Sequence, residues 1–161
     1  MRYVIFLLFT ILLLSCTTTL KEGGGDNIKH QLSIEPVFHS SHEPEKKSAP
    51  FSDVVQVGDI YYLSGQIGMD HSTRTLVDGG ITAETKQALE NIKAVLKHHG
   101  LELDDVVKAT VILDDIQDFS AFNEIYQAYF PQKPARTTFA AEALARGAKI
   151  EIEVVAIKVA Q

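Results

Sequence analysis

Residues 134–158, near the C-terminus, restrict the fold of this chain more than any other stretch does. They contain two strand-like runs, 137–144 and 149–158, with Gly147 in the short connection between them. Two such runs joined by a glycine-containing turn predict a β-hairpin. The outer ends of a hairpin meet, so we expect Arg136, at the head of the first run, to face the carboxylates in the middle of the second.

The second run alternates between two faces, as a β-strand does. One face carries Glu151, Glu153, Val155 and Ile157, and the other carries Ile150, Ile152, Val154 and Ala156. Carboxyl groups that share a face with aliphatic side chains are candidates for partial burial, which changes their pKa. An arginine beside a half-buried glutamate could bind an anionic substrate next to a general acid or base. The same pair could equally be a structural ion pair, for example at a contact between subunits.

The strands predicted upstream begin with a hairpin. Two strand-like runs, 54–57 and 60–64, flank a turn at Gly58 and Asp59. Residues 104–113 contain a further strand, in the apolar sequence Val-Val-Lys-Ala-Thr-Val-Ile-Leu.

Two helices are predicted between these strands and the C-terminal stretch. After a polar loop over 69–80, an amphipathic helix covers 82–99, with Thr82 as its N-cap and Gly100 at its end. A second helix begins at Asp118. Its apolar stripe consists of Phe119, Phe122, Ile125, Tyr126 and Tyr129. The order of elements predicts an α+β domain with two helices packed on one face of a sheet, and we expect an oligomer to cover the other face.

Residues 1–15 have the layout of an export signal. Arg2 supplies the positive charge, and the apolar run 4–14 is shorter than the roughly 20 residues that span a bilayer. The run leads into Leu-Leu-Ser-Cys, ending at Cys16, which resembles the bacterial lipoprotein box. In such signals the cysteine is acylated and becomes the first residue of the mature protein. An ordinary secretory signal with an incidental cysteine is the alternative.

The chain therefore divides into three expected regions: a signal peptide over 1–15, a lipid-anchored flexible tether over 16–35, and a folded domain over 36–161. The tether is polar and contains three consecutive glycines, so it has little apolar surface to bury. An exported chain with a lipid anchor would lie at a membrane, on its periplasmic or cell-surface side.

Composition restricts the chemistry of the domain. Cys16 is the only cysteine, which excludes an internal disulfide and a thiolate zinc site. The six histidines have no metal-ligand spacing with a cysteine or a carboxylate pair, so no metal is expected. The net charge of −6 argues against nucleic acid as the main partner, because phosphate binding requires a basic surface.

Short motifs distributed in order over residues 36–159 resemble the RidA (YjgF-type) reactive-intermediate deaminase family. They are Ala-Pro-Phe-Ser-Asp at 49–53, Val-Gly-Asp at 57–59, Leu-Ser-Gly-Gln-Ile-Gly at 63–68, Leu-Glu-Asn-Ile-Lys-Ala-Val-Leu at 89–96, Leu-Asp-Asp-Val-Val-Lys-Ala-Thr-Val at 103–111, Phe-Asn-Glu-Ile-Tyr at 122–126, Pro-Ala-Arg-Thr-Thr at 134–138 and Ile-Glu-Ile-Glu-Val at 150–154. Each motif has little specificity by itself, whereas the ordered set is specific.

The resemblance implies a chorismate-mutase-like (YjgF-type) fold with a mixed β-sheet, assembled as a homotrimer with ligand clefts between subunits. It implies hydrolysis of the imines and enamines of 2-keto acids, such as 2-aminoacrylate, to the keto acid and ammonia. No metal or organic cofactor is implied, and the expected partners are small 2-imino and 2-keto acids.

The resemblance also implies roles for individual positions. Arg136 matches the arginine that holds the substrate carboxylate, a task suited to the planar guanidinium group. Glu151 matches the acid/base residue that handles the attacking water. Ser64 and Gly65 match the Ser-Gly pair that lines the pocket, and Thr138 matches a position that contributes backbone contacts.

Two positions depart from the family pattern. Phe51 stands where many members have tyrosine, so a hydroxyl group is missing from the expected substrate pocket. Thr138 stands where many members have cysteine, which agrees with chemistry that needs no thiol.

Two other functions are open at this point. A non-catalytic trimer that binds keto acids at the cell envelope would use the same pocket without acid/base chemistry. Endoribonuclease activity is also ascribed to members of the family, but the acidic charge of this chain weighs against RNA as a substrate.

Overall fold

The computed structural model describes residues 34–159. Six strands form one sheet in the order β1-β2-β3-β8-β6-β7, and β4 pairs separately with β5. The strands are β1 (Val37–His39), β2 (Val54–Val57), β3 (Ile60–Ile67), β4 (Met69–Asp70), β5 (Thr75–Leu76), β6 (Val106–Leu113), β7 (Ala135–Ala140) and β8 (Ile150–Ile157). The β6–β7 pair is parallel and the other pairs are antiparallel, so the sheet is mixed.

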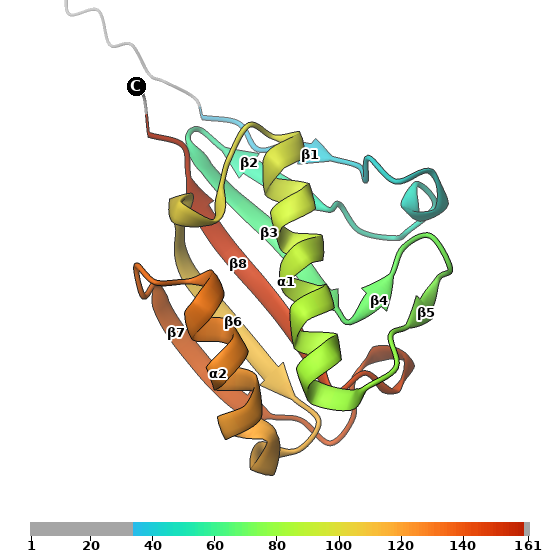
Figure 1. The fold of residues 1–161 in the computed structure, drawn as a ribbon. Coiled ribbons are helices and arrows are strands. Elements are labelled where there is room, and N and C mark those ends of the chain that lie inside the picture. The colour runs from blue at the N-terminus through green and yellow to red at the C-terminus, as the bar shows by residue number, and fades with distance from the viewer. Residues whose placement is uncertain (1–33, 160–161) are drawn as a thin grey trace, which may run out of the picture. The chain divides into compact units, whose positions relative to one another are not determined.

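Two helices, α1 (Gly80–His98) and α2 (Phe119–Tyr129), lie side by side on the same face of the sheet (Figure 1). Short 3-10 helices occupy the connections at Pro44–Lys46, Leu103–Asp105, Ile116–Asp118 and Ala145–Gly147. The predicted α+β fold, with both helices on one face of a mixed sheet, is confirmed. Neither helix of residues 34–159 is long and apolar enough to cross a membrane.

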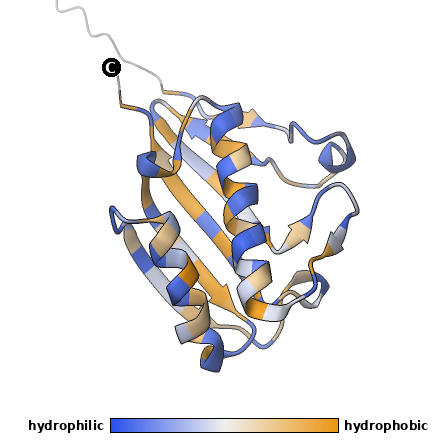
Figure 2. Cartoon of the chain, viewed as in Figure 1, coloured by the Kyte–Doolittle hydropathy of each residue, from blue (hydrophilic) through white to orange (hydrophobic). Residues whose placement is uncertain are grey.

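The core lies between the helices and the sheet. Helix α1 buries Ala88, Leu89, Ile92, Val95 and Leu96, and strand β8 buries Ile150, Ile152, Val154 and Ala156. Apolar residues accordingly gather on the strands beneath the helices, whereas the outward face of α1 is hydrophilic (Figure 2). Burying one large aliphatic side chain favours folding by about 1.5–3 kcal/mol. The alternation of β8 therefore determines which of its faces the helices cover, and leaves Glu151 and Glu153 on the other.

The two ends of α1 differ in how well they agree with the prediction. The helix begins at Gly80 and its N-cap is Gly79, so the assignment of Thr82 as the N-cap is wrong. Gly79 has a φ of 116°, a backbone conformation that favours glycine, and the helix has no side-chain cap. At the other end, Gly100 has a φ of 69° and its N–H donates to the carbonyl of Lys97, as expected for a helix-ending glycine.

The predicted C-terminal hairpin is wrong. Strands β7 and β8 do not pair, because β6 lies between them. The chain leaves β6, crosses over through α2 and returns as β7, parallel to β6. Residues 141–149 then carry it past the end of β6 to its other side, where β8 pairs antiparallel with β6. The N-terminal hairpin of β2 and β3 is confirmed, with Val57 opposite Ile60.

Smaller differences concern the segments that the sequence leaves irregular. The predicted loop over 69–80 contains β4 and β5, and Pro44 begins a turn of 3-10 helix. The predicted signal peptide over 1–15, Cys16 and the predicted tether over 16–35, apart from Ile34 and Glu35, lie outside the described residues.

Candidate active site

A pocket of about 380 Å³ opens where the end of β3 meets the start of β8. This volume lies within the range of roughly 300–1,000 Å³ that small-molecule sites occupy. The pocket is lined by Glu45, Lys46, Ser48, Ala49, Phe51, Gly65, Gln66, Ile67, Met69, His71, Arg74, Ala145, Arg146 and Glu151. Of the residues predicted for the site, Phe51, Gly65 and Glu151 line this pocket.

A bulge in β3 places Gly65 against Glu151. Leu63 pairs with Val154 and Gln66 pairs with Ile152, so two residues of β3 stand opposite one residue of β8. A Cβ atom at Gly65 would lie 2.8 Å from Cδ and 2.9 Å from Cγ of Glu151, closer than real Cβ contacts allow. Glycine at this position therefore makes room for the carboxyl group.

The environment of Glu151 favours its protonated form. The side chain is half-buried, and burial raises the pKa of its carboxyl group. The nearby charge of Glu153, which is exposed on the same face of β8, raises this pKa further. A raised pKa helps a carboxyl group to donate a proton as well as to accept one.

Ser64, the other residue of the bulge, hydrogen-bonds to the segment that precedes β2 in the same chain. Its hydroxyl group donates to the carbonyl of Ser52 at 2.7 Å, and its N–H donates to the carbonyl of Asp53 at 2.9 Å. These bonds hold the segment after Phe51 against β3, and the Phe51 ring, 55% exposed, lies at the pocket. Ser64 therefore supports the pocket wall from behind and does not itself line the pocket.

Arg136 lies on β7 with its guanidinium group against α2. Nη1 donates a hydrogen bond of 2.9 Å to Oδ1 of Asn123, and Cζ lies 4.6 Å from the centre of the Tyr126 ring and 5.1 Å from that of Phe122. Contacts of this kind stabilise an arginine without neutralising it. Among residues 34–159, no carboxylate lies within 4.0 Å of Arg136.

Arg136 and Glu151 lie on opposite faces of the sheet. Ala109 of β6 is in register with Arg136 on one side and with Val154 on the other, so all three point to the helices. Glu151 is three positions from Val154 and points to the open face. The expectation that Arg136 faces the carboxylates of β8 is wrong within one chain, and so is the alternative of an ion pair between them there.

Thr138 shares the face of Arg136 because it follows two positions later on β7, in register with Val111. Its Oγ1 atom is buried and has no hydrogen-bond partner in the described part of the chain. Neither Thr138 nor Arg136 reaches the pocket that contains Glu151. One chain thus brings together only part of the predicted site.

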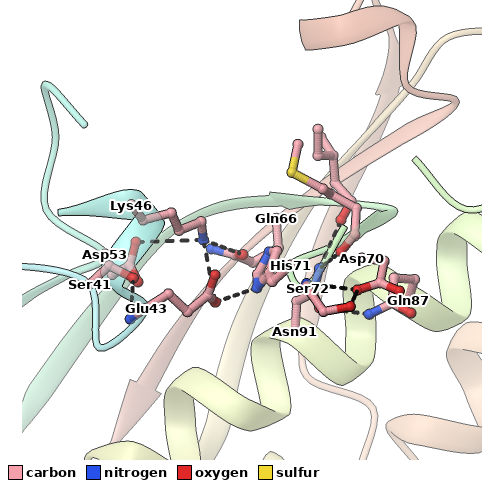
Figure 3. Close-up of polar contacts among 12 residues, drawn as sticks. Ser41, Glu43, Lys46, Asp53, Gln66, Asp70, His71, Ser72, Gln87 and Asn91 are labelled. Carbon is pink, nitrogen blue, oxygen red and sulfur yellow. Dashed lines mark hydrogen bonds and ion pairs between the residues drawn. The ribbon is translucent and has the colours of Figure 1, made fainter. Parts of the chain in front are cut away.

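Lys46 occupies the centre of a polar cluster on the pocket wall (Figure 3). Its Nζ lies 3.2 Å from Oε1 of Gln66, 3.7 Å from Oδ1 of Asp53 and 4.0 Å from Oε1 of Glu43. The side chains of Lys46 and Asp53 are only 11% and 3% exposed. A buried charge requires partners of this kind, so the positive charge of Lys46 is already compensated.

His71 joins this cluster through a contact between its Nδ1 and Glu43 (Figure 3). Desolvation lowers the pKa of His71 and the charge of Lys46 lowers it further, whereas Glu43 acts in the opposite direction. The imidazole is therefore mainly neutral at neutral pH. The sequence carries no local signal for this cluster, because its members are distant in sequence and the segment around Lys46 predicts only irregular structure.

Among the described residues that line the pocket, Glu151 is the group best placed for acid/base chemistry. Within residues 34–159, no group of three or more His, Cys, Asp or Glu side chains is placed to hold a metal ion. Glu151 combines a raised pKa, a pocket and a fixed position against Gly65. These properties suit proton transfer to or from a small substrate and a water molecule.

Comparison with known proteins identifies relatives over most of the chain. A family model described as Endoribonuclease L-PSP matches residues 41–158. The human 2-iminobutanoate/2-iminopropanoate deaminase is 50% identical over 110 residues, which cover 68% of this chain and 80% of the human protein.

Solved structures agree with this comparison. The structure of the YjgF gene product of E. coli is similar with a TM-score of 0.70 and 30% identity, over 76% of this chain and 99% of that one. RidA from an Antarctic Psychrobacter species gives a TM-score of 0.66 and 38% identity, over 69% of this chain and 90% of that one.

Proposed function

Because this chain belongs to the endoribonuclease L-PSP family, which contains the RidA proteins, we propose that it hydrolyses imines and enamines of 2-keto acids. The products would be the 2-keto acid and ammonia, as with 2-iminobutanoate and 2-iminopropanoate. The observation that carries the proposal is the environment of the Glu151 carboxyl group. This group lies in the pocket and against Gly65, and its pKa is raised.

The reaction requires little from the protein. In R–C(=NH2⁺)–COO⁻ + H2O → R–CO–COO⁻ + NH4⁺, the iminium carbon is already electrophilic. Ionised Glu151 takes a proton from the attacking water as the C–O bond forms and gives it to the amino nitrogen. The hydroxyl group then passes its proton to Glu151 as the C–N bond breaks and C=O forms, and Glu151 gives that proton to the departing ammonia. With an enamine, protonated Glu151 first supplies the proton to carbon. The raised pKa of Glu151 favours access to its protonated form as well as its ionised form.

The substrate carboxylate needs a cation, which we assign to Arg136 of a second copy in a homotrimer. Arg136 is held by a neutral asparagine and by aromatic rings, so its charge remains available to an anion. It lies on β7, one of the two edge strands of the described sheet. Because Arg136 and Glu151 of one chain face opposite sides, a cleft between copies is the arrangement in which the two act on one substrate.

Ser64, Gly65, Phe51 and Thr138 complete the proposed site. Gly65 admits the Glu151 carboxyl group, Ser64 fixes the bulge, and Phe51 supplies an apolar wall. Thr138, two positions after Arg136 on the same face of β7, would enter from the second copy and contribute backbone contacts. The site uses no metal or organic cofactor.

The proposed location is a membrane, on its periplasmic or cell-surface side. Residues 1–15 would be removed as a lipoprotein signal, Cys16 would carry the lipid, and residues 16–35 would connect it to the domain. Metabolic labelling with a fatty acid tests this, since Cys16→Ala should remove the label and release the protein from membranes. Wild-type protein without any lipid would contradict it.

An assay on the purified full chain tests the proposed reaction. An amino-acid oxidase generates 2-iminopropionate from alanine, and the decay of the imine is followed with and without the protein. We expect the wild type to accelerate the decay. Binding of pyruvate without any acceleration would instead identify a keto-acid binding module. Cleavage of RNA with no effect on the imine would favour an endoribonuclease, although a net charge of −6 opposes this.

A further inference from the structure

Two arginines at the pocket share an unusual backbone conformation. Arg74, between β4 and β5, has a φ of 60°, and Arg146, in the turn before β8, has a φ of 61°. Residues with a side chain rarely adopt this left-handed region, because it strains the backbone. Nη1 of Arg146 donates to the carbonyl oxygen of Arg74 at 3.1 Å, which joins the two turns. Both residues line the pocket that contains Glu151.

The charges of these two arginines are uncompensated within residues 34–159. No carboxylate of that part of the chain lies within 4.0 Å of either guanidinium group. Nη1 of Arg74 is also buried without any hydrogen-bond acceptor among those residues. A buried donor without an acceptor destabilises a fold, so an acceptor from outside this part of the chain is expected.

The other charged groups of the pocket do not remove this excess, because neither Glu45 nor Glu151 lies within 4.0 Å of either guanidinium group. Lys46 is occupied by Asp53, Glu43 and Gln66. Burial raises the pKa of the Glu151 carboxyl group. Arg74 and Arg146 thus bring two positive charges to the pocket that contains Glu151 and Gly65, in a chain whose net charge is −6.

We propose that Arg74 and Arg146 bind a second carboxylate of the substrate, so that the preferred substrates are imines of dicarboxylic 2-keto acids. This inference rests on the proposed function and specifies its substrate class. Arg136 of the second copy would hold the carboxylate next to the C=N bond, Glu151 would act at that bond, and the two pocket arginines would hold the side-chain carboxylate. Guanidinium groups present paired N–H donors that match a carboxylate.

The reaction on such a substrate is balanced in the same way. For 2-iminosuccinate, ⁻OOC–CH2–C(=NH2⁺)–COO⁻ + H2O gives ⁻OOC–CH2–CO–COO⁻ + NH4⁺. The second carboxylate takes no part in bond making or breaking. Its contribution is selectivity, because an aliphatic side chain of similar size leaves both arginines without an acceptor.

A pair of imines of nearly equal size tests the inference on the purified full chain. An aspartate oxidase generates 2-iminosuccinate, and an amino-acid oxidase generates 2-iminobutyrate from 2-aminobutyrate. We expect kcat/KM of the wild type to favour 2-iminosuccinate by at least about tenfold, which is the effect of one charge-assisted contact. Arg74→Gly and Arg146→Gly should each reduce this ratio by roughly tenfold, mainly through a lower kcat/KM for 2-iminosuccinate.

Glycine is the informative replacement because it adopts a positive φ without strain, so these variants should fold at least as well as the wild type. Lys133→Gly is the matched control. Lys133 also has a positive φ, of 57°, and carries a positive charge, but it does not line the pocket. It should leave the substrate ratio unchanged.

Calorimetric binding of oxaloacetate and 2-oxobutyrate gives a second readout that does not depend on turnover. The wild type should bind oxaloacetate more tightly, and the double variant Arg74→Gly/Arg146→Gly should bind the two keto acids equally. If the wild type hydrolyses neither imine but keeps this binding preference, the proposed reaction fails and the second anion site stands. Equal handling of the two ligands by the wild type would overturn the inference, as would variants that dissociate the oligomer without changing the ratio.

Discussion

The carboxyl group of Glu151 lies against the backbone of Gly65, at the bulge where β3 and β8 lose register. The absence of a side chain at one residue thus determines where the other can place its carboxyl group. Bulges of this kind are frequent beside active sites, because they direct a side chain out of the regular pleat. The proposed chemistry depends on this contact.

Gly65→Ala should therefore reduce imine hydrolysis by roughly 10²-fold, the cost of displacing a catalytic group by about 1 Å. The added methyl group would overlap with Cγ and Cδ of Glu151. Turnover and thermal unfolding of Gly65→Ala, Glu151→Ala and the double variant measure this. Removing the Glu151 side chain should cancel most of the stability cost of the Gly65→Ala substitution, since the two groups compete for one space. Additive stability losses would mean that Gly65 has a different role.

The raised pKa of Glu151 predicts a pH-dependent stability. The folded chain holds this proton more tightly than the unfolded chain, so the favourable contribution is complete below the unfolded pKa and is lost as pH rises through the folded pKa. Glu151→Gln lacks this loss. Denaturant unfolding should show the variant gaining stability relative to the wild type as the pH rises from the ordinary range of a glutamate through the folded pKa of Glu151. A constant difference over this range would contradict the burial of the carboxyl group.

The hydrogen bond between Arg136 and the neutral side chain of Asn123 predicts how a charge at position 123 would affect substrate binding. Asn123→Asp would place a carboxylate at the guanidinium group, so the KM for anionic imines should rise by about tenfold while the fold is retained. Gln127→Glu, which adds the same charge at an exposed position of α2, is the control and should change KM little. Arg136→Ala should abolish turnover and Arg136→Lys should restore little of it, because a lysine lacks the planar fork. Dissociation of the Arg136→Ala oligomer without loss of specific activity would indicate a structural role.

The open face of the sheet predicts the oligomer. Tyr62 and Phe139, which are 45% and 46% exposed, are in register with Val155 and Ile112 on the face opposite the helices. Native mass spectrometry of the full chain should give a trimer. Phe139→Asp should raise the dissociation constant by at least about tenfold, because it introduces a charge into an apolar contact. Ile116→Asp, at an equally exposed position in the 3-10 helix before α2, should not. A monomer at micromolar concentration would remove the proposed cleft.

The parts of the fold that depend on local periodicity could be predicted from the sequence. The buried face of α1 and the alternation of β8 follow from spacing alone. The pairing of strands does not follow from local spacing. Helix α2 lies between β6 and β7 in the sequence and packs on the sheet, so β7 returns parallel to β6 and pairs with it. The pocket could not be predicted for the same reason, because its residues come from segments that are distant in sequence. Lys46 meets Gln66, and Arg146 meets the carbonyl of Arg74, across long stretches of chain that carry no common pattern.

The measurement that tests the account most directly is the rate of 2-iminopropionate hydrolysis by Glu151→Gln relative to the wild type. The substitution keeps the size and hydrogen bonding of the side chain but removes its proton exchange. We predict a loss of roughly 10²–10⁴-fold with pyruvate binding retained, and a small effect of Glu153→Gln, which alters an exposed carboxylate on the same face. Equal losses from the two substitutions, or an unimpaired Glu151→Gln, would contradict the assignment of Glu151 as the acid/base group.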